Sequence, residues 1–391
     1  MQKLAGIYIH IPFCERKCAY CNFNTTDYFD DLAARYVDAV SREIQCWGER
    51  LSDEHQLAFD TIYFGGGTPS IVEADHLARL VAGCRDSFDI TSSAEITIEI
   101  NPATFDRKKL ETWLDAGITR ASVGSQSFID RELQSLNRTH TANDARRTVE
   151  QLREAGFRNI SLDLIAGLPE QSLADWQFNL EEALRVRPEH LSLYLLEVKE
   201  GTRLFSQIER GLRPRPDDDL AAQMYRLISE ATAEAGYEHY EISNFALATG
   251  PASQMEQSPF RSKHNMKYWT AAPFYGMGCG AHSYDTRARW VNILKTEEYI
   301  ARVATTGHGV ASSHELSSED RAEEALFMGL RLKEGIALDQ FRDEHAVDVL
   351  ERYGEDLPRL ADAGLIEINN GRMMLTEAGR LLSNEVFVSF V

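Results

Sequence analysis

The sequence predicts an α/β protein: a partial (β/α) barrel followed by a small α+β domain with a winged-helix-like arrangement. Two observations carry this prediction. Over roughly the first 245 residues, short β-rich runs alternate with longer amphipathic stretches, the pattern of parallel strands joined by crossover helices. After about residue 310 the pattern changes to short helices followed by two short strand-like runs. We therefore expect three parts, residues 1–245, 246–310 and 311–391.

The predicted strands of the barrel are short runs rich in β-branched and other apolar residues. They are Gly6–His10, Thr61–Phe64, Ile96–Ile100, Arg120–Val123, Ile160–Leu164, Leu191–Leu195 and Glu238–Ile242. Helical periodicity between them is clearest over Leu32–Trp47, Ala142–Ala155 and Leu173–Ala183. Three helices are expected to end at Gly117, Gly156 and Gly236, because glycine readily takes the left-handed position that closes a helix. In such a barrel, chemistry gathers at the carboxyl ends of the strands.

The last 80 residues lack the alternation of strands and helices that marks the barrel. Helices are predicted at Glu319–Arg331, Leu338–Glu344 and Leu357–Gly364, and an Asn-Asn-Gly turn joins the strands Leu365–Ile368 and Met373–Leu375. Between the two domains, Ala248–Ser262 is rich in Pro, Gly, Ser and Gln and is predicted as a loop.

Composition narrows the function classes. The chain has 391 residues, of which 43% are hydrophobic, and a net charge of −20, which argues against nucleic acid or an anionic membrane as its main partner. It contains no apolar run of about 18 residues, so no membrane-spanning helix is expected. Six cysteines, three of them clustered, do not resemble a disulfide framework. We therefore expect a cytoplasmic protein with free thiols.

The clustered cysteines are the most informative feature. Cys14, Cys18 and Cys21 have the spacing C-x3-C-x2-C on one short loop. Three thiolates can hold three corners of a cubane iron–sulfur cluster and leave one iron open. A zinc site would need a fourth ligand, for which His10 is available, and an electron-transfer cluster usually has four cysteines.

Polar residues at successive strand ends form a second pattern. The turn Gly65-Gly66-Gly67-Thr68 follows the second strand and can bring backbone N–H groups close to an anionic group. Glu99, Gln126 and Asp163 end later strands, and a carboxylate inside an apolar strand is costly unless it is paired or bound. Arg138 can supply the cation for a ligand carboxylate.

Together, the cysteine loop, the Gly-Gly-Gly-Thr-Pro turn and these strand ends resemble the radical S-adenosylmethionine (SAM) superfamily. Within it, the chain is similar to the branch that holds the oxygen-independent coproporphyrinogen III oxidases and the related heme chaperones. The resemblance implies that the three cysteines bind a 4Fe–4S cluster whose fourth iron is chelated by SAM. It also implies contacts to that SAM from Tyr8, Tyr20, Gly66 and Glu99. The positions that hold a second SAM in the oxidase are matched by Gly67, Thr68, Gln126, Arg138 and Asp163.

Two features of the sequence distinguish the heme chaperones from the coproporphyrinogen III oxidases. The oxidase pattern has a further cysteine two residues after the third, and this chain has Phe23 there. The run from His264 to Trp269 fits the H-N-x-x-Y-W motif of the heme chaperones. The resemblance implies heme binding by His264, Asn265, Tyr268 and Trp269. Imidazole is a common heme ligand, and aromatic rings offer flat faces to a porphyrin.

The resemblance therefore predicts a heme chaperone that passes heme to an acceptor such as a respiratory hemoprotein and takes electrons from a reductant. Coproporphyrinogen III oxidase activity is the alternative, and it is disfavoured by Phe23. Whether SAM is cleaved and whether the chain forms a homodimer stay open in the sequence.

Overall fold

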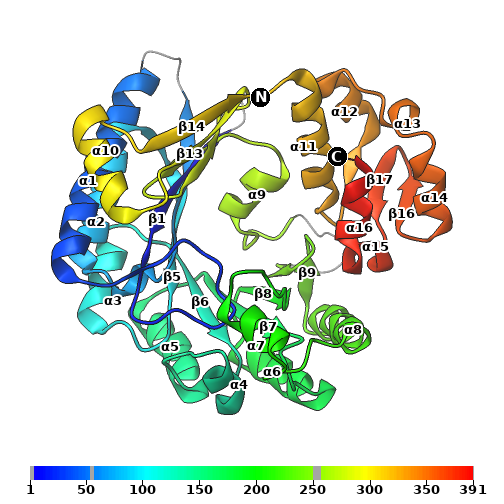
Figure 1. Cartoon of the computed structure of the whole chain (residues 1–391), viewed down its shortest axis with the longest axis horizontal. Coiled ribbons are helices and arrows are strands. Elements are labelled where there is room, and N and C mark those ends of the chain that lie inside the picture. The colour runs from blue at the N-terminus through cyan, green and yellow to red at the C-terminus, as the bar shows by residue number, and fades with distance from the viewer. Residues whose placement is uncertain (1–3, 53–56, 250–256, 391) are drawn as a thin grey trace.

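The computed structural model describes residues 4–52, 57–249 and 257–390. Its main feature is a 12-stranded sheet in the order β14-β13-β12-β11-β1-β4-β5-β6-β7-β8-β10-β9, which curves into a partial barrel (Figure 1). The central parallel strands are β1 (Ala5–Ile11), β4 (Ala58–Gly66), β5 (Asp89–Ile100), β6 (Arg120–Gln126), β7 (Ile160–Ala166) and β8 (His190–Leu195). The predicted α/β partial barrel is thus confirmed.

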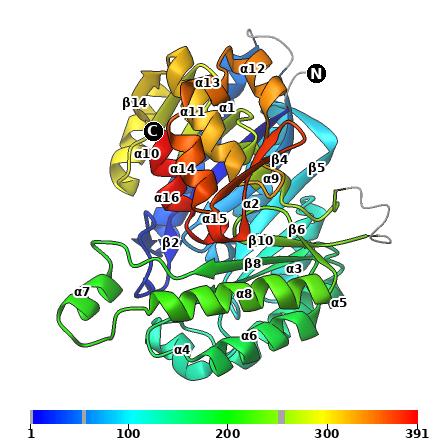
Figure 2. The ribbon, with the colours of Figure 1, turned by 90° about the vertical axis from the view of Figure 1, so that its right-hand side faces the viewer.

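Helices cover the outer face of this sheet (Figure 1). They are α1 (Asp30–Ser52), α2 (Ala74–Ser87), α3 (Arg107–Asp115), α4 (Asp130–Ser135), α5 (Ala142–Ala155), α6 (Leu173–Val186) and α8 (Asp218–Glu234). Helix α7 (Arg203–Glu209) instead projects beyond the sheet (Figure 2) and packs against the cysteine loop, where the Leu204 N–H donates to the Ala19 carbonyl. Side chains such as Val40, Ile44 and Leu80 are fully buried against the strands. Helix α5 has the predicted bounds and ends at Gly156, whose φ of 116° is left-handed as expected.

The last predicted barrel strand was wrong in its extent. Instead of Glu238–Ile242, β9 covers Tyr237–His239, and the chain turns back as β10 (Asn244–Leu247), antiparallel to both β9 and β8. The buried Glu241 carboxylate stabilises the turn, since it accepts hydrogen bonds from the Ser243 N–H and the Asn244 amide.

Residues after this hairpin extend the sheet on the other side of β1. They form α9 (Lys263–Trp269), β11 (Phe274–Met277), β12 (His282–Tyr284), β13 (Ala288–Asn292), α10 (Thr296–Thr306) and β14 (Val310–Glu315). Strand β11 runs parallel to β1. The predicted loop Ala248–Ser262 has no helix or strand at residues 248–249 and 257–262, and residues 250–256 lie outside the described part.

The C-terminal part forms a separate group of elements in Figure 1 and has its own hydrophobic core. Its helices are α11 (Ser318–Leu330), α12 (Leu338–His345), α13 (Val349–Arg352), α14 (Asp356–Asp362), α15 (Glu377–Leu381) and α16 (Ser383–Phe387). The predicted hairpin is β16 (Ile366–Asn369) with β17 (Arg372–Leu375), and β15 (Ile336–Ala337) pairs with β17 as a third strand. The domain limits at residues 245 and 310 stay predictions.

Three short elements lie near the carboxyl ends of the barrel strands. Strands β2 (Phe13–Cys14) and β3 (Thr26–Asp27) pair with each other around the cysteine loop, and the 3-10 turn Pro69–Ile71 follows β4. A second 3-10 turn, Val388–Phe390, closes the chain. Within the described residues, no helix is long and apolar enough to cross a membrane.

Candidate functional site

A cavity of about 510 Å³ opens at the carboxyl ends of the central strands. We call it the strand-end cavity. The predicted site residues that line it are Cys14, Cys18, Tyr20, Cys21, Gly66, Gly67, Thr68, Glu99, Gln126, Arg138 and Asp163. Tyr8 lies behind this wall, where its ring stacks on Tyr63 at 6.2 Å and its hydroxyl is 3.1 Å from His10 Nδ1. Eleven positions that are far apart in sequence thus share one hollow of ligand size.

The three cysteines are free thiols at the mouth of this cavity. Among the described residues, no three His, Cys, Asp or Glu side chains converge as ligands of one ion. In a cubane cluster each cysteine binds a different iron, so three thiols on one loop can hold such a cluster without converging on one ion. His10 does not serve as a fourth ligand here, because its Nε2 bonds the Asn24 carbonyl at 2.9 Å. Burial raises the pKa of Cys14 to about 11, so a thiolate at this position needs a positive partner such as iron.

Arg138 supplies positive charge on the inner side of the cysteine loop. Its Nη1 lies 3.5 Å from Cys18 Sγ, and its Nη2 donates to Asn101 Oδ1 and to the Gly124 carbonyl. Its Nε is buried and has no hydrogen-bond partner among the described residues. Arg138 lines the cavity, and a guanidinium there fits an anionic ligand group such as the carboxylate of SAM.

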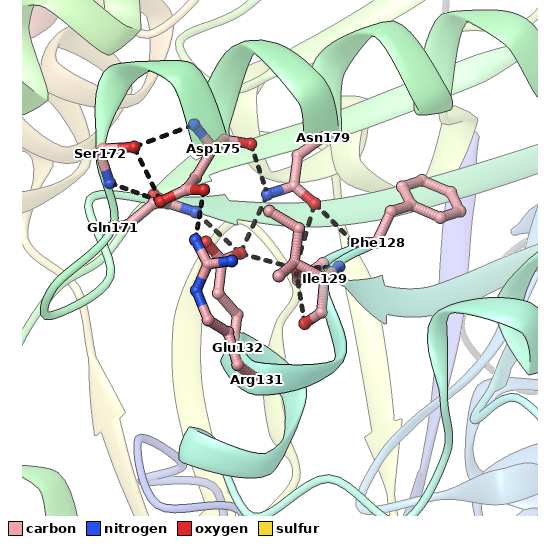
Figure 3. Close-up of polar contacts among 9 residues, drawn as sticks. Phe128, Ile129, Arg131, Glu132, Gln171, Ser172, Asp175 and Asn179 are labelled. Carbon is pink, nitrogen blue, oxygen red and sulfur yellow. Dashed lines mark hydrogen bonds and ion pairs between the residues drawn. The ribbon is translucent and has the colours of Figure 1, made fainter.

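A buried polar network holds the segment that carries Gln126 and Arg138 (Figure 3). Glu132 on α4 accepts hydrogen bonds from Ser127, Gln171 and Asn179, at 2.6, 3.1 and 2.9 Å. The Asn179 side-chain oxygen accepts in turn from the Phe128 N–H and lies 3.0 Å from the Ser127 hydroxyl. These bonds connect α6 to the turn after β6 and to α4. The network therefore stabilises the backbone on which Gln126 and Arg138 stand.

The glycine turn after β4 leaves no room for side chains. A Cβ on Gly66 would lie 2.4 Å from the His10 ring, and Gly66 has a φ of 118°. A Cβ on Gly67 would lie 2.7 Å from the carbonyls of Pro12 and Phe13. The turn is therefore packed against β1 and β2 and presents its backbone to the cavity.

Two carboxylates lie deeper in the cavity. Glu99 Oε1 accepts from the Tyr63 hydroxyl at 2.9 Å, and Oε2 accepts from the Gly66 N–H at 3.0 Å. Burial outweighs these bonds and raises the pKa of Glu99 to about 7. Burial also raises the pKa of Asp163, although hydrogen bonds from Ser192 and Ser122 oppose it. Both groups would be stabilised as carboxylates by a cationic or hydroxyl-bearing ligand, which fits SAM.

The H-N-x-x-Y-W residues lie elsewhere, on α9. His264 is buried, with Nδ1 2.8 Å from Thr61 Oγ1 and Nε2 3.0 Å from the Tyr268 hydroxyl. Burial lowers the pKa of His264 to about 3. Asn265 is half-buried on the same helix. Tyr268 and Trp269 line a second hollow of about 280 Å³, which we call the α9 groove.

The sequence did not point to several residues that line the strand-end cavity or bond to its side chains. Tyr63 bonds Glu99, Asn101 bonds Arg138, Ser122 bonds Asp163, and Tyr194 lines the cavity at the end of β8. Asn101 and Tyr194 stand at or just past strand ends, so their position was a usable signal. Tyr63 and Ser122 lie inside strands, where their position gave no signal of a role in the site.

Comparison with known proteins identifies the family. Residues 8–183 match the radical SAM superfamily domain, and residues 316–382 match the HemN C-terminal domain. The chain is 34% identical over 389 residues to the heme chaperone HemW of Bacillus subtilis, which covers 99% of both chains. The chain belongs to the HemW family of radical SAM proteins.

Two further likenesses agree with this family. HemW of Lactococcus lactis is 33% identical, over all of this chain and 98% of the relative. The coproporphyrinogen III oxidase HemN of Escherichia coli, described as a radical SAM enzyme, superposes with a TM-score of 0.83. That match covers 100% of this chain and 90% of HemN at 22% identity, so it supports the fold alone.

Proposed function

We propose that this protein is a heme chaperone that binds heme and transfers it to acceptor hemoproteins, and that it carries a 4Fe–4S cluster and SAM. The observation that carries the proposal is the full-length similarity to proteins named heme chaperone HemW, at 34% and 33% identity. This chain also shares its fold with the oxidase HemN. Only the residues of the site can therefore show which of the two activities the chain has.

The strand-end cavity supports the cluster and SAM. Cys14, Cys18 and Cys21 would hold three irons, and a reduced cluster of this type supplies an electron that can cleave bound SAM. Glu99 and the glycine turn would orient the amino group of SAM, while Arg138 would pair with its carboxylate. Thr68 and Arg138 lie 3.5 Å from Cys14 and Cys18, so these two residues of the predicted second SAM site are next to the cluster ligands.

Phe23 weighs against the oxidase. Its side chain is 61% exposed and lines the strand-end cavity, where the oxidase pattern has a further cysteine. A phenyl ring can neither donate a proton nor form a thiyl species. The chain therefore lacks that reactive group at the mouth of its cavity.

Heme would bind beside α9, where Tyr268 and Trp269 line a groove. Iron ligation by His264 stays a prediction. In this structure both of its ring nitrogens are within hydrogen-bond distance of Thr61 and Tyr268, so ligation would require the ring to leave these partners. An acceptor such as a respiratory hemoprotein, a reductant for the cluster and a cytoplasmic location belong to the same proposal.

The deciding experiment uses one anaerobically reconstituted sample of the full chain. It is loaded with hemin, separated from free hemin and mixed with an apo-hemoprotein, and transfer is followed by the Soret band of the acceptor. The same sample receives SAM, reductant and coproporphyrinogen III. We expect heme transfer without protoporphyrinogen IX. Absence of heme binding, or turnover of coproporphyrinogen well above a no-SAM control, would reject the proposal.

A further inference from the structure

Hydrogen-bond donors lie beside the sulfur atoms of the cysteine loop. Thr68 Oγ1, at the end of the glycine turn after β4, is 3.5 Å from Cys14 Sγ. Arg138 Nη1, from the segment after α4, is 3.5 Å from Cys18 Sγ. Two residues that are distant from the loop in sequence thus contact its sulfur atoms directly, in addition to lining the strand-end cavity.

The direction of these two hydrogen bonds is fixed once the cysteines bind iron. A free thiol can donate to the Thr68 hydroxyl or accept from it, but an iron-bound thiolate has lost its proton and can only accept. The hydroxyl must therefore donate to Cys14. The Arg138 guanidinium has donors alone and keeps its charge at any ordinary pH. Both residues therefore donate to ligand sulfurs when the cluster is bound.

The third cysteine has similar surroundings. Burial raises the pKa of Cys21, and a hydrogen bond from the Phe23 N–H and the positive charges of Lys17 and Arg138 oppose this rise. Lys17 Nζ donates to the Phe23 carbonyl at 3.2 Å, which holds this cation on the loop. The whole chain has a net charge of −20, so the donors and cations at the three sulfurs are a local property of the loop.

We propose that Thr68 and Arg138 raise the reduction potential of the 4Fe–4S cluster by donating hydrogen bonds to the sulfur atoms of two of its ligands. This inference rests on the proposed function, because it concerns the cluster of that same chaperone. Reduction transfers one electron from the reductant to the cluster, and no bond forms or breaks. The cluster with its thiolates gains one negative charge, which donors and a cation at the sulfurs stabilise.

The resemblance assigns both residues to a second SAM, and these contacts give them a use at the cluster itself. A hydroxyl carries one hydrogen, so Thr68 cannot donate to Cys14 and to a second SAM at the same time. Arg138 Nη2 donates to the Asn101 side chain and to the Gly124 carbonyl, and these bonds hold Nη1 at the Cys18 sulfur. Because the same guanidinium is also the proposed partner of the SAM carboxylate, its effect on the cluster has to be measured without SAM.

The test is a redox titration of the reconstituted full-length protein without SAM, in which electron paramagnetic resonance counts the reduced cluster. Thr68→Val keeps the shape and removes the hydroxyl. It should lower the ratio of reduced to oxidised cluster at a fixed potential by about threefold to tenfold, and tenfold corresponds to about 59 mV for one electron. Arg138→Gln should lower it about tenfold or more, because a charge is lost as well. Thr68→Ser should restore the wild-type value. Thr305→Val and Arg302→Gln, at exposed positions of α10, are the matched controls and should titrate as wild type.

The outcomes separate this inference from the proposed function. A wild-type chain that assembles no 4Fe–4S cluster rejects the cluster of the proposed function and this inference with it. A cluster whose potential is the same in wild type, Thr68→Val and Arg138→Gln, or higher in the variants, rejects the inference alone. A Thr68→Ser potential as low as that of Thr68→Val also rejects the role of the hydroxyl. If Arg138→Gln has a low iron content or melts early, Arg138→Lys replaces it and should show a smaller drop in potential, because the charge is kept.

Discussion

The buried Glu99 carboxyl predicts an unusual stability profile for the ligand-free protein. Its pKa is raised from an ordinary 4.5 to about 7, first because burial disfavours the charged form, and hydrogen bonds from Tyr63 and Gly66 only partly oppose this. Between pH 4.5 and 7 the folded state therefore binds more protons at this site than the unfolded state. By linkage, the free energy of unfolding falls as pH rises through that window, and the penalty is complete above pH 7.

The magnitude follows from the two pKa values. A shift of this size costs about 3 kcal/mol at full ionisation, of which roughly 2–3 kcal/mol develops between pH 5 and pH 8. Glu99→Gln removes the ionisation but keeps the shape. The variant should therefore lack this component of the pH dependence, although its single amide oxygen can accept from only one of the two donors now bound by the two carboxylate oxygens.

The assay compares chemical unfolding of wild type and Glu99→Gln at pH 5 and pH 8 without SAM. Relative to wild type, the variant should gain roughly 2–3 kcal/mol on going from pH 5 to pH 8. It should also bind SAM more weakly, because the carboxylate that we propose as the partner of the SAM ammonium is gone. An identical stability difference at both pH values would refute the raised pKa and with it the argument for a cationic ligand at this position.

Three further substitutions test the packing of the site. Gly67→Ala should abolish SAM binding and destabilise the fold, whereas Gly83→Ala, whose added Cβ meets nothing closer than 3.9 Å, should melt as wild type in thermal scans. Glu132→Ala leaves the Gln171 amide and one N–H of the Asn179 amide without an acceptor and should cost about 3–5 kcal/mol in chemical unfolding, while Arg131→Ala at the exposed end of the same network should change little (Figure 3). Cys18→Ala should lose the iron and sulfide of the cluster in elemental analysis and keep hemin binding, since the groove shares no residue with the cysteine loop. Loss of both would contradict two separate sites.

The sequence predicted the strand-end cavity well because its signals are local. Cysteine spacing, a run of glycines and polar residues at strand ends each lie within a few positions, and the parallel topology then brings them to one edge. Strands β11 to β14 were missed because they are short and are held by distant partners. Glu43 on α1, for example, accepts from the Gly278 and Gly309 N–H groups and from the Tyr299 hydroxyl, which fastens this segment to the barrel.

The environment of His264 could not be predicted for a related reason. A helical spacing of four places His264 and Tyr268 on one side of α9, but only the packing against β1 and β4 decides whether that side faces solvent or the barrel. Gly6 shows how close the packing is, since an added Cβ there would lie 3.1 Å from the His264 ring.

A continuous set of contacts joins the two sites. Glu99 accepts from the Tyr63 hydroxyl, the Tyr63 ring stacks on His264 at 5.1 Å, and His264 bonds Tyr268 in the α9 groove. A ligand that fixes the Glu99 carboxylate can therefore change the position of the groove wall, and coupling of this kind is typically 5- to 150-fold in affinity. Because linkage is reciprocal, heme must change SAM affinity by the same factor as SAM changes heme affinity. Tyr63→Phe keeps the ring stack and removes the bond to Glu99, so it should bring that factor close to one in paired hemin titrations with and without SAM. If the factor is the same in Tyr63→Phe as in wild type, the bond between Tyr63 and Glu99 does not carry the coupling.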